Sequence, residues 1–471
     1  MSATRLPRLL VAAPASGAGK TTVTFGLLEA LRRRGLRPAA FKCGPDYIDP
    51  LYHREVVGAR SGNLDLFFTD DARARSLLAR GAQGCDVAVL EGVMGLYDGL
   101  GATSVVASSY DVARATGTPV VLVLDARGSS VTLAAVARGL ATMRPDARVA
   151  GVILNRCSEA LCARVAPVIQ ELSGLRVLGC VPTCAAADLP SRHLGLVTAG
   201  ELDDVRARVA QVAQTMTRTV DLDGLLAVAD EAEPIVEQPF RSPRVAADPV
   251  TIAVASDRAF CFYYEENLRM LRDMGARVAP FSPLDDEALP AGTAGLYLGG
   301  GYPELSAPRL AANARMRAAV ADAVAAGMPV VAECGGFMYL LDAIQDDRGE
   351  RWPMVGALPG VARDEGRLRH FGYVTLRADR DGLYGPAGTE LPAHEFHYWH
   401  AADEGGDFIA TRPTRPDAWA CGHTGATMVA GFPHVYWPAA PACAERFVRA
   451  AVAYASAHGI PRDGGAPCSR S

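Results

Sequence analysis

Short apolar runs rich in β-branched residues alternate with longer segments of helical spacing along the first half of the chain, and this alternation restricts its fold more than any other feature. A strand that is apolar along its whole length needs cover on both faces, which a parallel sheet with helical connections provides. The pattern therefore predicts a doubly wound α/β domain. The expected strands are residues 9–13, 39–43, 87–90, 120–125, 149–155 and 177–181, separated by helical segments such as 21–34 and 130–144.

The composition changes after this domain, and a second alternating pattern follows. Residues 231–249 are charged, contain prolines and have no periodicity, as is typical of a linker. Further strands are expected at residues 251–255, 277–281, 295–298 and 330–333, and shorter alternating runs at 370–377 and 395–400 predict an antiparallel addition. We expect two doubly wound α/β domains at residues 1–230 and 250–460, joined by the linker 231–249 and followed by a frayed tail at 461–471.

The charge balance and the cysteines exclude several classes of protein. The chain has 47 basic and 52 acidic residues, so a broad basic surface for nucleic acid is not expected. No apolar run reaches the roughly 18–20 residues that a membrane-spanning helix needs. The 11 cysteines form no C-x-x-C spacing and no dense disulfide pattern. We expect a reduced, cytoplasmic enzyme that binds neither nucleic acid nor membrane.

Only two of the 47 basic residues are lysines, Lys20 and Lys42. On a solvated surface arginine and lysine are nearly equivalent charges, but a compact ammonium on a flexible stem is preferred where it must reach a phosphate or carboxylate oxygen. A chain so biased towards arginine is expected to keep lysine where the exchange is harmful, with chance survival as the alternative. Both lysines fall in recognisable motifs.

Residues 14–22 read Pro-Ala-Ser-Gly-Ala-Gly-Lys-Thr-Thr, follow an expected strand and open an expected helix. This is the context of a phosphate loop, in which glycines let backbone N–H groups converge on phosphate, the lysine adds a point charge and a threonine hydroxyl binds Mg²⁺. Pro14 departs from the usual pattern, because a glycine ordinarily stands six residues before the lysine. The expected ATP-binding residues of the loop are Ser16, Gly17, Gly19, Lys20, Thr21 and Thr22.

Polar side chains stand at the carboxyl ends of three other expected strands, where parallel sheets bind ligands. Glu91 follows one strand, and Lys42 lies at the end of another, followed by Asp46 in a Gly-Pro-Asp sequence that is otherwise a simple turn. We expect Thr21, Asp46 and Glu91 to hold Mg²⁺, which needs several oxygen ligands. Asn155 ends a third strand, where its amide either binds adenine of ATP or caps a turn.

A second site is expected at Cys334, which follows the strand 330–333 and is flanked by small residues. A nucleophile on such a strand–turn–helix elbow sits in a strained conformation, and the helix N-terminus favours a thiolate and a developing oxyanion. His434 follows in the chain as the base that a cysteine nucleophile requires. The expected oxyanion donors are the backbone N–H groups of Gly300, Gly301 and Gly335.

The histidines of residues 394–400 do not predict a zinc site, despite their density. In a strand, His394 and His400 face one way. Glu395 and His397 face the other, which divides any ligand set. Glu395 or His397 is expected to line the cleft instead.

Together these segments resemble the cobyrinic and hydrogenobyrinic acid a,c-diamide synthases of cobalamin biosynthesis, from Leu9 to about Trp437. The first half is similar to phosphate-loop proteins of the dethiobiotin-synthetase type, and the second half to class I glutamine amidotransferases. The resemblance implies that Cys334 is the glutaminase nucleophile and that His434 raises its nucleophilicity. The most specific segments are residues 42–50 (KCGPDYIDP), 91–99 (EGVMGLYDG), 299–304 (GGGYPE) and 394–398 (HEFHY).

The same resemblance implies an ATP-dependent carbon–nitrogen ligase with L-glutamine as amido donor. ATP with Mg²⁺ phosphorylates a carboxylate of a corrinoid polycarboxylate, and ammonia released at Cys334 attacks the acyl phosphate. The first domain then binds both ATP and the corrinoid, with Lys42, Asp46 and Tyr47 positioning the substrate carboxylate. The expected sites of amidation are the a and c acetates of hydrogenobyrinic acid or cobyrinic acid, and their order stays open.

Tyr436 is a second departure, because an acid usually stands two residues after the amidotransferase histidine. A backbone carbonyl or a distant acid must then orient His434. Close alternatives for the function are cobyric acid synthase and nickel-sirohydrochlorin a,c-diamide synthase. A partitioning-type phosphate-loop switch ATPase with an inactive fused domain is an alternative of another class, but it leaves Cys334 without a purpose. A homodimer is a fair expectation.

Overall fold

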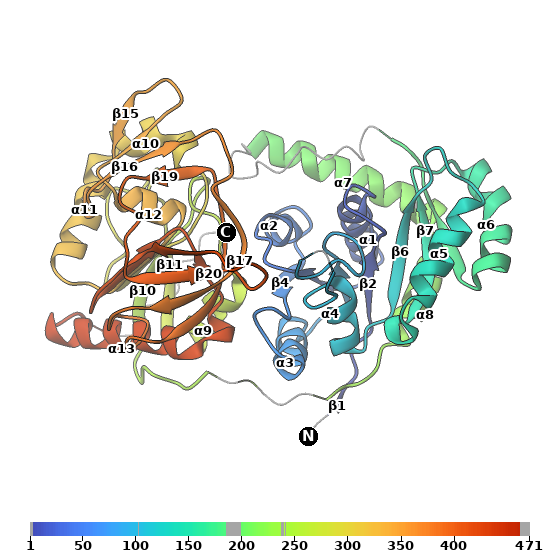
Figure 1. The fold of residues 1–471 in the computed structure, drawn as a ribbon, viewed down its shortest axis with the longest axis horizontal. Helices are drawn as coiled ribbons and strands as arrows, with labels where there is room; N and C mark the ends of the chain where they lie inside the picture. Colours follow the sequence, from blue (N-terminus) through green and yellow to red (C-terminus); the bar gives the residue numbers. More distant parts are fainter. Residues whose placement is uncertain (1–2, 102, 185–198, 237–239, 241, 462–471) are drawn as a thin grey trace. The chain divides into compact units, whose positions relative to one another are not determined.

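The chain divides into two compact units, which Figure 1 shows as a ribbon and which are described one at a time. Unit 1 contains Met1–His193 and Val197–Phe240, and unit 2 contains Leu194–Leu196 and Arg241–Ser471. Both units are built on a mainly parallel sheet with helical connections, which confirms the expected class of two doubly wound α/β domains. No helix in the described part of the chain is long and apolar enough to cross a membrane. The computed structural model describes residues 3–101, 103–184, 199–236, 240 and 242–461.

The sheet of unit 1 has seven parallel strands in the order β4-β3-β5-β2-β6-β7-β8. Strands β3, β4 and β5 lie on one side of β2, and β6, β7 and β8 lie on the other. The connections therefore change direction beside β2, and the crevice at such a switch point is where open parallel sheets bind ligands. The strands are β2 (Arg8–Ala12), β3 (Pro38–Cys43), β4 (Arg60–Leu64), β5 (Val87–Glu91), β6 (Val120–Asp125), β7 (Val149–Asn155) and β8 (Arg176–Val181).

Six of these strands match the expected apolar runs within one or two residues, whereas β4 has no counterpart in the sequence analysis. The sequence of β4, Arg-Ser-Gly-Asn-Leu, is polar and so lacks the apolar run used to predict the other strands. Its Asn63 donates hydrogen bonds to the carbonyls of Gly44 (2.9 Å) and Asp46 (2.8 Å) instead of packing as an apolar side chain. The helices of unit 1 are α1 (Lys20–Arg33), α2 (Ile48–Glu55), α3 (Asp71–Gly81), α4 (Ser109–Thr116), α5 (Thr132–Thr142), η1 (Pro145–Ala147), α6 (Glu159–Ser173), α7 (Ala199–Thr219) and α8 (Leu222–Asp230).

Unit 2 has a six-stranded sheet in the order β11-β10-β12-β13-β23-β22, parallel except for β22. Its strands are β10 (Val250–Ala255), β11 (Ala276–Phe281), β12 (Thr293–Leu298), β13 (Val330–Glu333), β22 (His423–Thr424) and β23 (Met428–Gly431). The helices of unit 2 are α9 (Glu265–Asp273), η4 (Pro303–Ser306), α10 (Ala307–Ala312), α11 (Ala314–Ala325), α12 (Gly335–Leu340), η5 (Trp437–Ala439) and α13 (Pro441–Ala457).

Two smaller sheets form the expected antiparallel addition. The five-stranded one runs β21-β20-β17-β18-β24 and is antiparallel throughout, and the four-stranded one runs β15-β14-β16-β19. The strands are β14 (Ala343–Gln345), β15 (Arg351–Pro353), β16 (Val361–Asp364), β17 (His370–Ala378), β18 (Glu390–His397), β19 (Trp399–Ala401), β20 (Phe408–Thr411), β21 (Ala418–Cys421) and β24 (His434–Val435).

The expectation of one strand over residues 395–400 is wrong. Strand β18 ends at His397, and β19 begins at Trp399 in a different sheet. The side chain of His397 bridges this break, with its Nδ1 2.6 Å from the carbonyl oxygen of Trp399. His394 and His400 therefore do not share a face of one strand.

The segment expected as a linker contains some regular structure. Strand β9 (Ile235–Val236) pairs antiparallel with β1 (Ala3–Thr4), and Ile235 is buried. The boundary between the two units follows Phe240, inside the segment 231–249. The domain limits inferred from sequence stay predictions, and the expected tail at 461–471 lies almost wholly outside the described residues.

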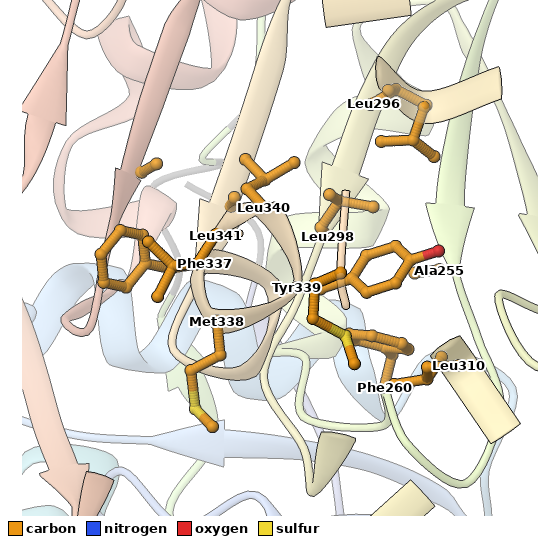
Figure 2. Close-up of a cluster of buried hydrophobic side chains, with 14 of the residues drawn as sticks. Ala255, Phe260, Leu296, Leu298, Leu310, Phe337, Met338, Tyr339, Leu340 and Leu341 are labelled. Atoms are coloured by element: carbon orange, nitrogen blue, oxygen red, sulfur yellow. The ribbon is translucent and has the colours of Figure 1, made fainter. Parts of the chain in front are cut away.

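Helix α12 is part of the core of unit 2 (Figure 2). Every residue of this helix is buried, as expected for a helix without a polar face. The rings of Phe260 and Tyr339 meet edge to face at 5.3 Å, and Leu298 of β12 packs in the same cluster. The start of α12 is therefore held by the core and by the end of β12, which fixes the residue that precedes it.

Two helical glycines of unit 1 provide a matched test of close packing. A Cβ at Gly26 of α1 would lie 2.5 Å from Met216 Sδ and 2.7 Å from Val212 Cγ1 of α7, whereas a Cβ at the exposed Gly139 of α5 meets nothing within 4 Å. Gly26→Ala is expected to cost about 1–3 kcal/mol of packing, less the gain in helix propensity. Gly139→Ala should stabilise by up to about 1 kcal/mol. Thermal unfolding of both variants measures the difference, and equal midpoints would contradict the close approach of α1 and α7.

Candidate functional site

The loop between β2 and α1 has the backbone shape of a phosphate loop. Gly17 and Gly19 have φ angles of 80° and 94°, in the left-handed region that side chains disfavour. A Cβ at Gly19 would also lie only 2.1 Å from Asn155 Nδ2. The loop therefore needs glycine at position 19 for both its conformation and its packing. Ser16 is exposed on the loop, and Thr21 and Thr22 lie half-buried in the first turn of α1.

Asn155 holds this loop from the end of β7, two strands away from β2 in the sheet. Its Nδ2 donates a hydrogen bond of 2.8 Å to the carbonyl oxygen of Ala18, and the side chain is buried. Of the two roles left open by the sequence, the structure therefore provides the structural one, and contact with adenine stays a prediction.

The ammonium of Lys20 is folded back onto the loop. Lys20 Nζ donates to the carbonyl oxygen of Ala15 at 3.1 Å and to that of Met94. Met94 is a non-glycine residue with a positive φ of 47°, in the segment that follows β5. A backbone held in this region is strained, and such strain collects at functional sites. The sequence analysis gave Met94 no role, although its segment was among the most specific in the chain.

Glu91, at the end of β5, is the centre of a buried polar cluster. Thr21 Oγ1 donates to Glu91 Oε1 over 2.6 Å, and Lys42 Nζ donates to the same oxygen over 2.8 Å. His53 Nε2 lies 3.2 Å from Glu91 Oε2. Burial alone would raise the pKa of Glu91, but the Lys42 and His53 charges and hydrogen bonds outweigh it and lower that pKa. Glu91 is therefore a carboxylate, directly beside the hydroxyl expected to bind Mg²⁺.

Lys42 is enclosed between two carboxylates. Besides Glu91, its Nζ lies 2.5 Å from Asp49 Oδ2, and both side chains are almost fully buried. Burial works to lower the pKa of Lys42, but the neighbouring Asp49, Glu91 and Asp46 charges raise it overall. For Asp49, burial and the Glu91 charge raise the pKa to about 8 against the opposing effect of Lys42. The role of Lys42 in positioning a substrate carboxylate stays a prediction.

Asp46 and Tyr47 form the entry to α2. Asp46 Oδ1 accepts hydrogen bonds from the backbone N–H groups of Ile48 (2.8 Å) and Asp49 (3.2 Å), as a capping residue does. The Gly-Pro-Asp turn is thus a local structural element, and Asp46 is also close enough to raise the pKa of Lys42. The proposed metal and substrate roles of Asp46 and Tyr47 stay predictions.

In unit 2, Cys334 stands on the strained elbow that the sequence predicted. Its φ and ψ are 50° and −106°, between β13 and α12. Its N–H donates to the carbonyl of Gly431 at 2.8 Å. A Cβ at Gly336 would lie 2.0 Å from the carbonyl oxygen of Leu298, so only glycine allows the helix to begin so close to β12.

The N–H of Gly335 favours the thiolate of Cys334, as the sequence predicted for the elbow, but burial acts against it. Burial, with the Glu304 carboxylate next in effect, raises the pKa of Cys334 to about 12. The N–H of Gly335 does stabilise the thiolate, but it is outweighed by burial and by the charges of Glu395 and Glu333. Cys334 is therefore a neutral thiol at physiological pH, and its activation requires a base.

His434 lies beside the glycine loop, residues 299–301, which follows β12. A Cβ at Gly300 would be 2.5 Å from His434 Cε1 and 3.1 Å from Nε2. A Cβ at Gly335 would be 3.1 Å from the N atom of Gly301, so the elbow and the loop also meet. The structure thus brings the elbow of Cys334, the glycine loop and His434 together.

The glycine loop presents a backbone amide towards the elbow. The carbonyl of Gly300 accepts hydrogen bonds of 3.0 Å from both Cys261 N and Phe262 N. In a trans peptide the N–H of Gly301 points opposite to this carbonyl, away from those amides and on the side where Gly335 approaches. This geometry favours Gly301 as an oxyanion donor, while donation by Gly300 and Gly335 stays a prediction.

The His-rich segment contributes a buried pair near this site. Glu395 Oε1 and His397 Nε2 are 2.9 Å apart, and the imidazole of His397 stacks on Phe432 with ring centroids 3.9 Å apart. His400 instead pairs with Glu404 in the neighbouring sheet. Within the described ranges, no group of three or more His, Cys, Asp or Glu side chains is placed to hold a metal ion.

Sequence reasoning missed three residues of these sites. His53 was given no function, although it lies only three residues after the specific segment 42–50. Glu333 was seen only as the end of a strand, and Tyr297 only as an apolar strand residue. Nothing in their spacing shows that all three meet catalytic groups, because the contacts join distant strands.

Comparison with known proteins defines the class of each unit. The CobQ/CobB/MinD/ParA nucleotide binding domain family matches residues 9–197, and the CobB/CobQ-like glutamine amidotransferase domain family matches residues 251–430. The chain thus combines a nucleotide-binding domain with a glutamine amidotransferase domain. Among solved structures, PurLQS from Thermotoga maritima aligns with a TM-score of 0.31 and 13% identity, over 44% of this chain and 99% of that chain.

Curated relatives identify the family more narrowly. A cobyrinate a,c-diamide synthase from Streptococcus sanguinis is 40% identical, over 92% of this chain and 96% of the relative. Proteins of the same name from Listeria monocytogenes (40% identical, 87% and 89% covered) and Syntrophotalea carbinolica (39% identical, 94% and 98% covered) are also similar. The chain belongs to the cobyrinate a,c-diamide synthase family.

The protonation state of Cys334 predicts a distinctive pH dependence for its alkylation. Only the thiolate reacts with iodoacetamide, so below the raised pKa the rate of loss of glutaminase activity should increase about tenfold per pH unit. We expect this increase to continue from pH 7 to pH 9 without levelling. Loss of activity is compared with alkylation of free cysteine under the same conditions, and a plateau below pH 8 would show a resting thiolate instead.

Proposed function

We propose that this protein is an ATP-dependent carbon–nitrogen ligase that uses glutamine to amidate the a and c acetate carboxylates of a cobyrinate-type corrinoid in cobalamin biosynthesis. The observation that carries the proposal is the presence of two separate reaction centres in one chain. One is a phosphate loop beside the buried carboxylate of Glu91, and the other is the Cys334 elbow beside His434 and the glycine loop.

In unit 1 the carboxylate of the substrate is made electrophilic. An oxide is a poor leaving group, so amide formation needs transfer of the γ-phosphoryl group of ATP to the acid, giving an acyl phosphate. The N–H groups of the loop around Gly17 and Gly19 bind phosphate oxygens, and Lys20 supplies a positive charge to the transferring group. The carbonyls of Ala15 and Met94, which hold Lys20 Nζ, keep the ammonium on the loop until nucleotide binds.

The residues present fit a magnesium ion that accompanies the nucleotide. Two oxygen donors, Thr21 Oγ1 and Glu91 Oε1, lie 2.6 Å apart beside the loop, and Glu91 is ionised. Thr21 and Glu91, with Asp46 nearby, would hold the ion, which neutralises charge on the phosphates when bound. Lys42 donates to the same oxygen of Glu91 as Thr21, and His53 lies at the other oxygen, so both orient the carboxylate for this purpose.

In unit 2 glutamine supplies the nitrogen. His434 removes the proton from the neutral Cys334 thiol, whose sulfur attacks the side-chain amide carbon. The N–H of Gly301, with those of Gly300 and Gly335, stabilises the negative oxygen of the tetrahedral intermediate. Collapse of this intermediate releases ammonia and leaves a thioester, which water hydrolyses with His434 again acting as base. Ammonia then attacks the carbonyl carbon of the acyl phosphate, the bond to phosphate breaks, and loss of inorganic phosphate and a proton gives the amide.

Separate inactivation of the two centres tests this division of labour. Cys334→Ala should abolish glutamine hydrolysis and glutamine-dependent amidation, yet retain amidation with ammonium chloride at pH 8.5. Lys20→Met should show the reverse, with glutamine hydrolysis retained and both kinds of amidation reduced at least about a hundredfold. Coupled assays of ammonia, ADP and amide measure these activities. A Cys334→Ala protein that still consumes glutamine would remove the assignment of the nucleophile.

The identity of the macrocycle is tested by mass spectrometry. The names of the relatives support cobyrinic acid, and its metal-free counterpart hydrogenobyrinic acid carries the same acetates. We expect two carboxylate-to-amide exchanges in whichever macrocycle is accepted, in the presence of ATP, Mg²⁺ and glutamine. Conversion of neither macrocycle would overturn the proposed substrate, and more than two exchanges would favour the cobyric acid synthase alternative.

A further inference from the structure

The position usually occupied by the orienting acid of an amidotransferase cannot serve in this chain. Tyr436, two residues after His434, is fully buried and packs edge to face on Tyr264 with ring centroids 4.9 Å apart. It is a core residue and carries no carboxylate. The imidazole of His434 needs another group to fix its orientation and tautomer, because a general base must offer an unprotonated nitrogen to the thiol.

The carboxyl group of Glu333 lies close to the imidazole of His434. Glu333 Oε2 is 3.6 Å from His434 Nδ1, and both side chains are at most 5% exposed. This separation exceeds that of an ordinary hydrogen bond, but catalytic hydrogen bonds are often long without substrate and shorten in the complex. Glu333 is the last residue of β13, so the residue directly before the nucleophile approaches the base.

The carboxylate of Glu333 is fixed by two donors. Val435 N donates to Oε1 and Tyr297 Oη donates to Oε2, each over 3.0 Å. Tyr297 is itself immobilised, because its ring stacks on Trp437 with centroids 4.9 Å apart. Buried carboxyl oxygens need hydrogen-bond partners, and here they come from β12 and from the residue after His434. The carboxylate and the imidazole are therefore held to the same piece of backbone.

The two nitrogens of the imidazole face different groups. Nδ1 is the nitrogen near Glu333, whereas Nε2 and Cε1 are the atoms near the glycine loop, as the close approach to Gly300 shows. A proton on Nδ1 would point towards the carboxylate and leave Nε2 free to accept the thiol proton. We propose that Glu333 is the positioning residue of the glutaminase site, in place of the missing acid at 436.

The proton balance of the reaction follows from this arrangement. The S–H bond of Cys334 breaks as its proton moves to Nε2, and the sulfur electron pair forms the bond to the amide carbon of glutamine. Glu333 stabilises the imidazolium that results without taking a proton itself. The proton on Nε2 passes to the leaving nitrogen as the C–N bond breaks, and ammonia departs. No additional reactant is required.

The inference rests on the proposed glutaminase function, and Glu333→Gln tests it with little change of shape. The amide keeps an oxygen that accepts from Val435 N but loses the charge. We expect kcat for glutamine hydrolysis to fall at least about a hundredfold with KM changed less than threefold, and ammonium-dependent amidation to be retained. Glu266→Gln, which alters another buried glutamate of the same unit, should keep glutaminase activity within about twofold. Full activity of Glu333→Gln would overturn the inference.

The pH profile of kcat/KM distinguishes positioning from a structural role. The titratable groups around His434 are Glu333 of β13, Cys334 on the elbow that follows it, His394 of β18 and Tyr297 of β12. Burial and His434 lower the pKa of His394 to about 3, and burial raises the pKa of Tyr297 well above its usual value, so both stay neutral between pH 5 and pH 9. Removing the Glu333 charge should move the acid limb to lower pH. Reduced kcat with an unmoved acid limb would indicate a structural role and overturn the inference.

A second measurement needs no variant of Glu333. In the full chain labelled with ¹⁵N-histidine, the His434 signals are assigned by their loss in His434→Gln, and their shifts give the tautomer. We expect the proton on Nδ1, and a proton on Nε2 would overturn the inference even if Glu333→Gln failed to fold. If the wild-type protein releases no ammonia from glutamine, the proposed function fails, while the tautomer still decides the role of Glu333.

Discussion

Both candidate sites depend on a helix that follows a parallel strand, with a glycine near its start where another part of the chain comes too close for a side chain. In unit 1, a side chain on Gly19 would collide with Asn155 at the end of β7. In unit 2, a side chain on Gly336 would collide with the carbonyl of Leu298. These short approaches bring helix N-termini and backbone N–H groups to the carboxyl edge of each sheet. Phosphate binding and oxyanion stabilisation are two uses of the same geometry.

Both lysines of the chain lie in polar clusters of unit 1. Lys20 is held by two carbonyls on the phosphate loop, and Lys42 lies between the carboxylates of Asp49 and Glu91. Replacing a buried cation by arginine would require room for a planar guanidinium, which a cluster this enclosed lacks. Buried ion pairs contribute little net stability but impose a geometry, since breaking one leaves an uncompensated charge. The two lysines are thus explained by position rather than by chance survival.

The sequence predicted the strands that are apolar throughout and the two turns that carry glycine beside a reactive side chain. Their signals are local, because periodicity and turn chemistry are set by neighbours along the chain. It did not predict β4, whose Asn63 donates to carbonyls elsewhere in the chain, or the break at Tyr398, which the side chain of His397 bridges. The pairing of Glu91 with His53 also depends on the order of strands in the sheet. Contacts between residues that are far apart in the chain produce no recognisable periodicity or motif in the sequence.

The state of the thiol links the elbow to the rest of unit 2. A cysteine whose thiolate is stabilised at rest is open to oxidation and to stray electrophiles, since reactivity follows thiolate character. Here burial keeps Cys334 protonated, so nucleophilicity arises only when a base takes the proton. The proposed base, His434, has its Nδ1 3.6 Å from the carboxyl group of Glu333. In the proposed reaction the thiolate therefore forms only transiently, as the sulfur attacks glutamine.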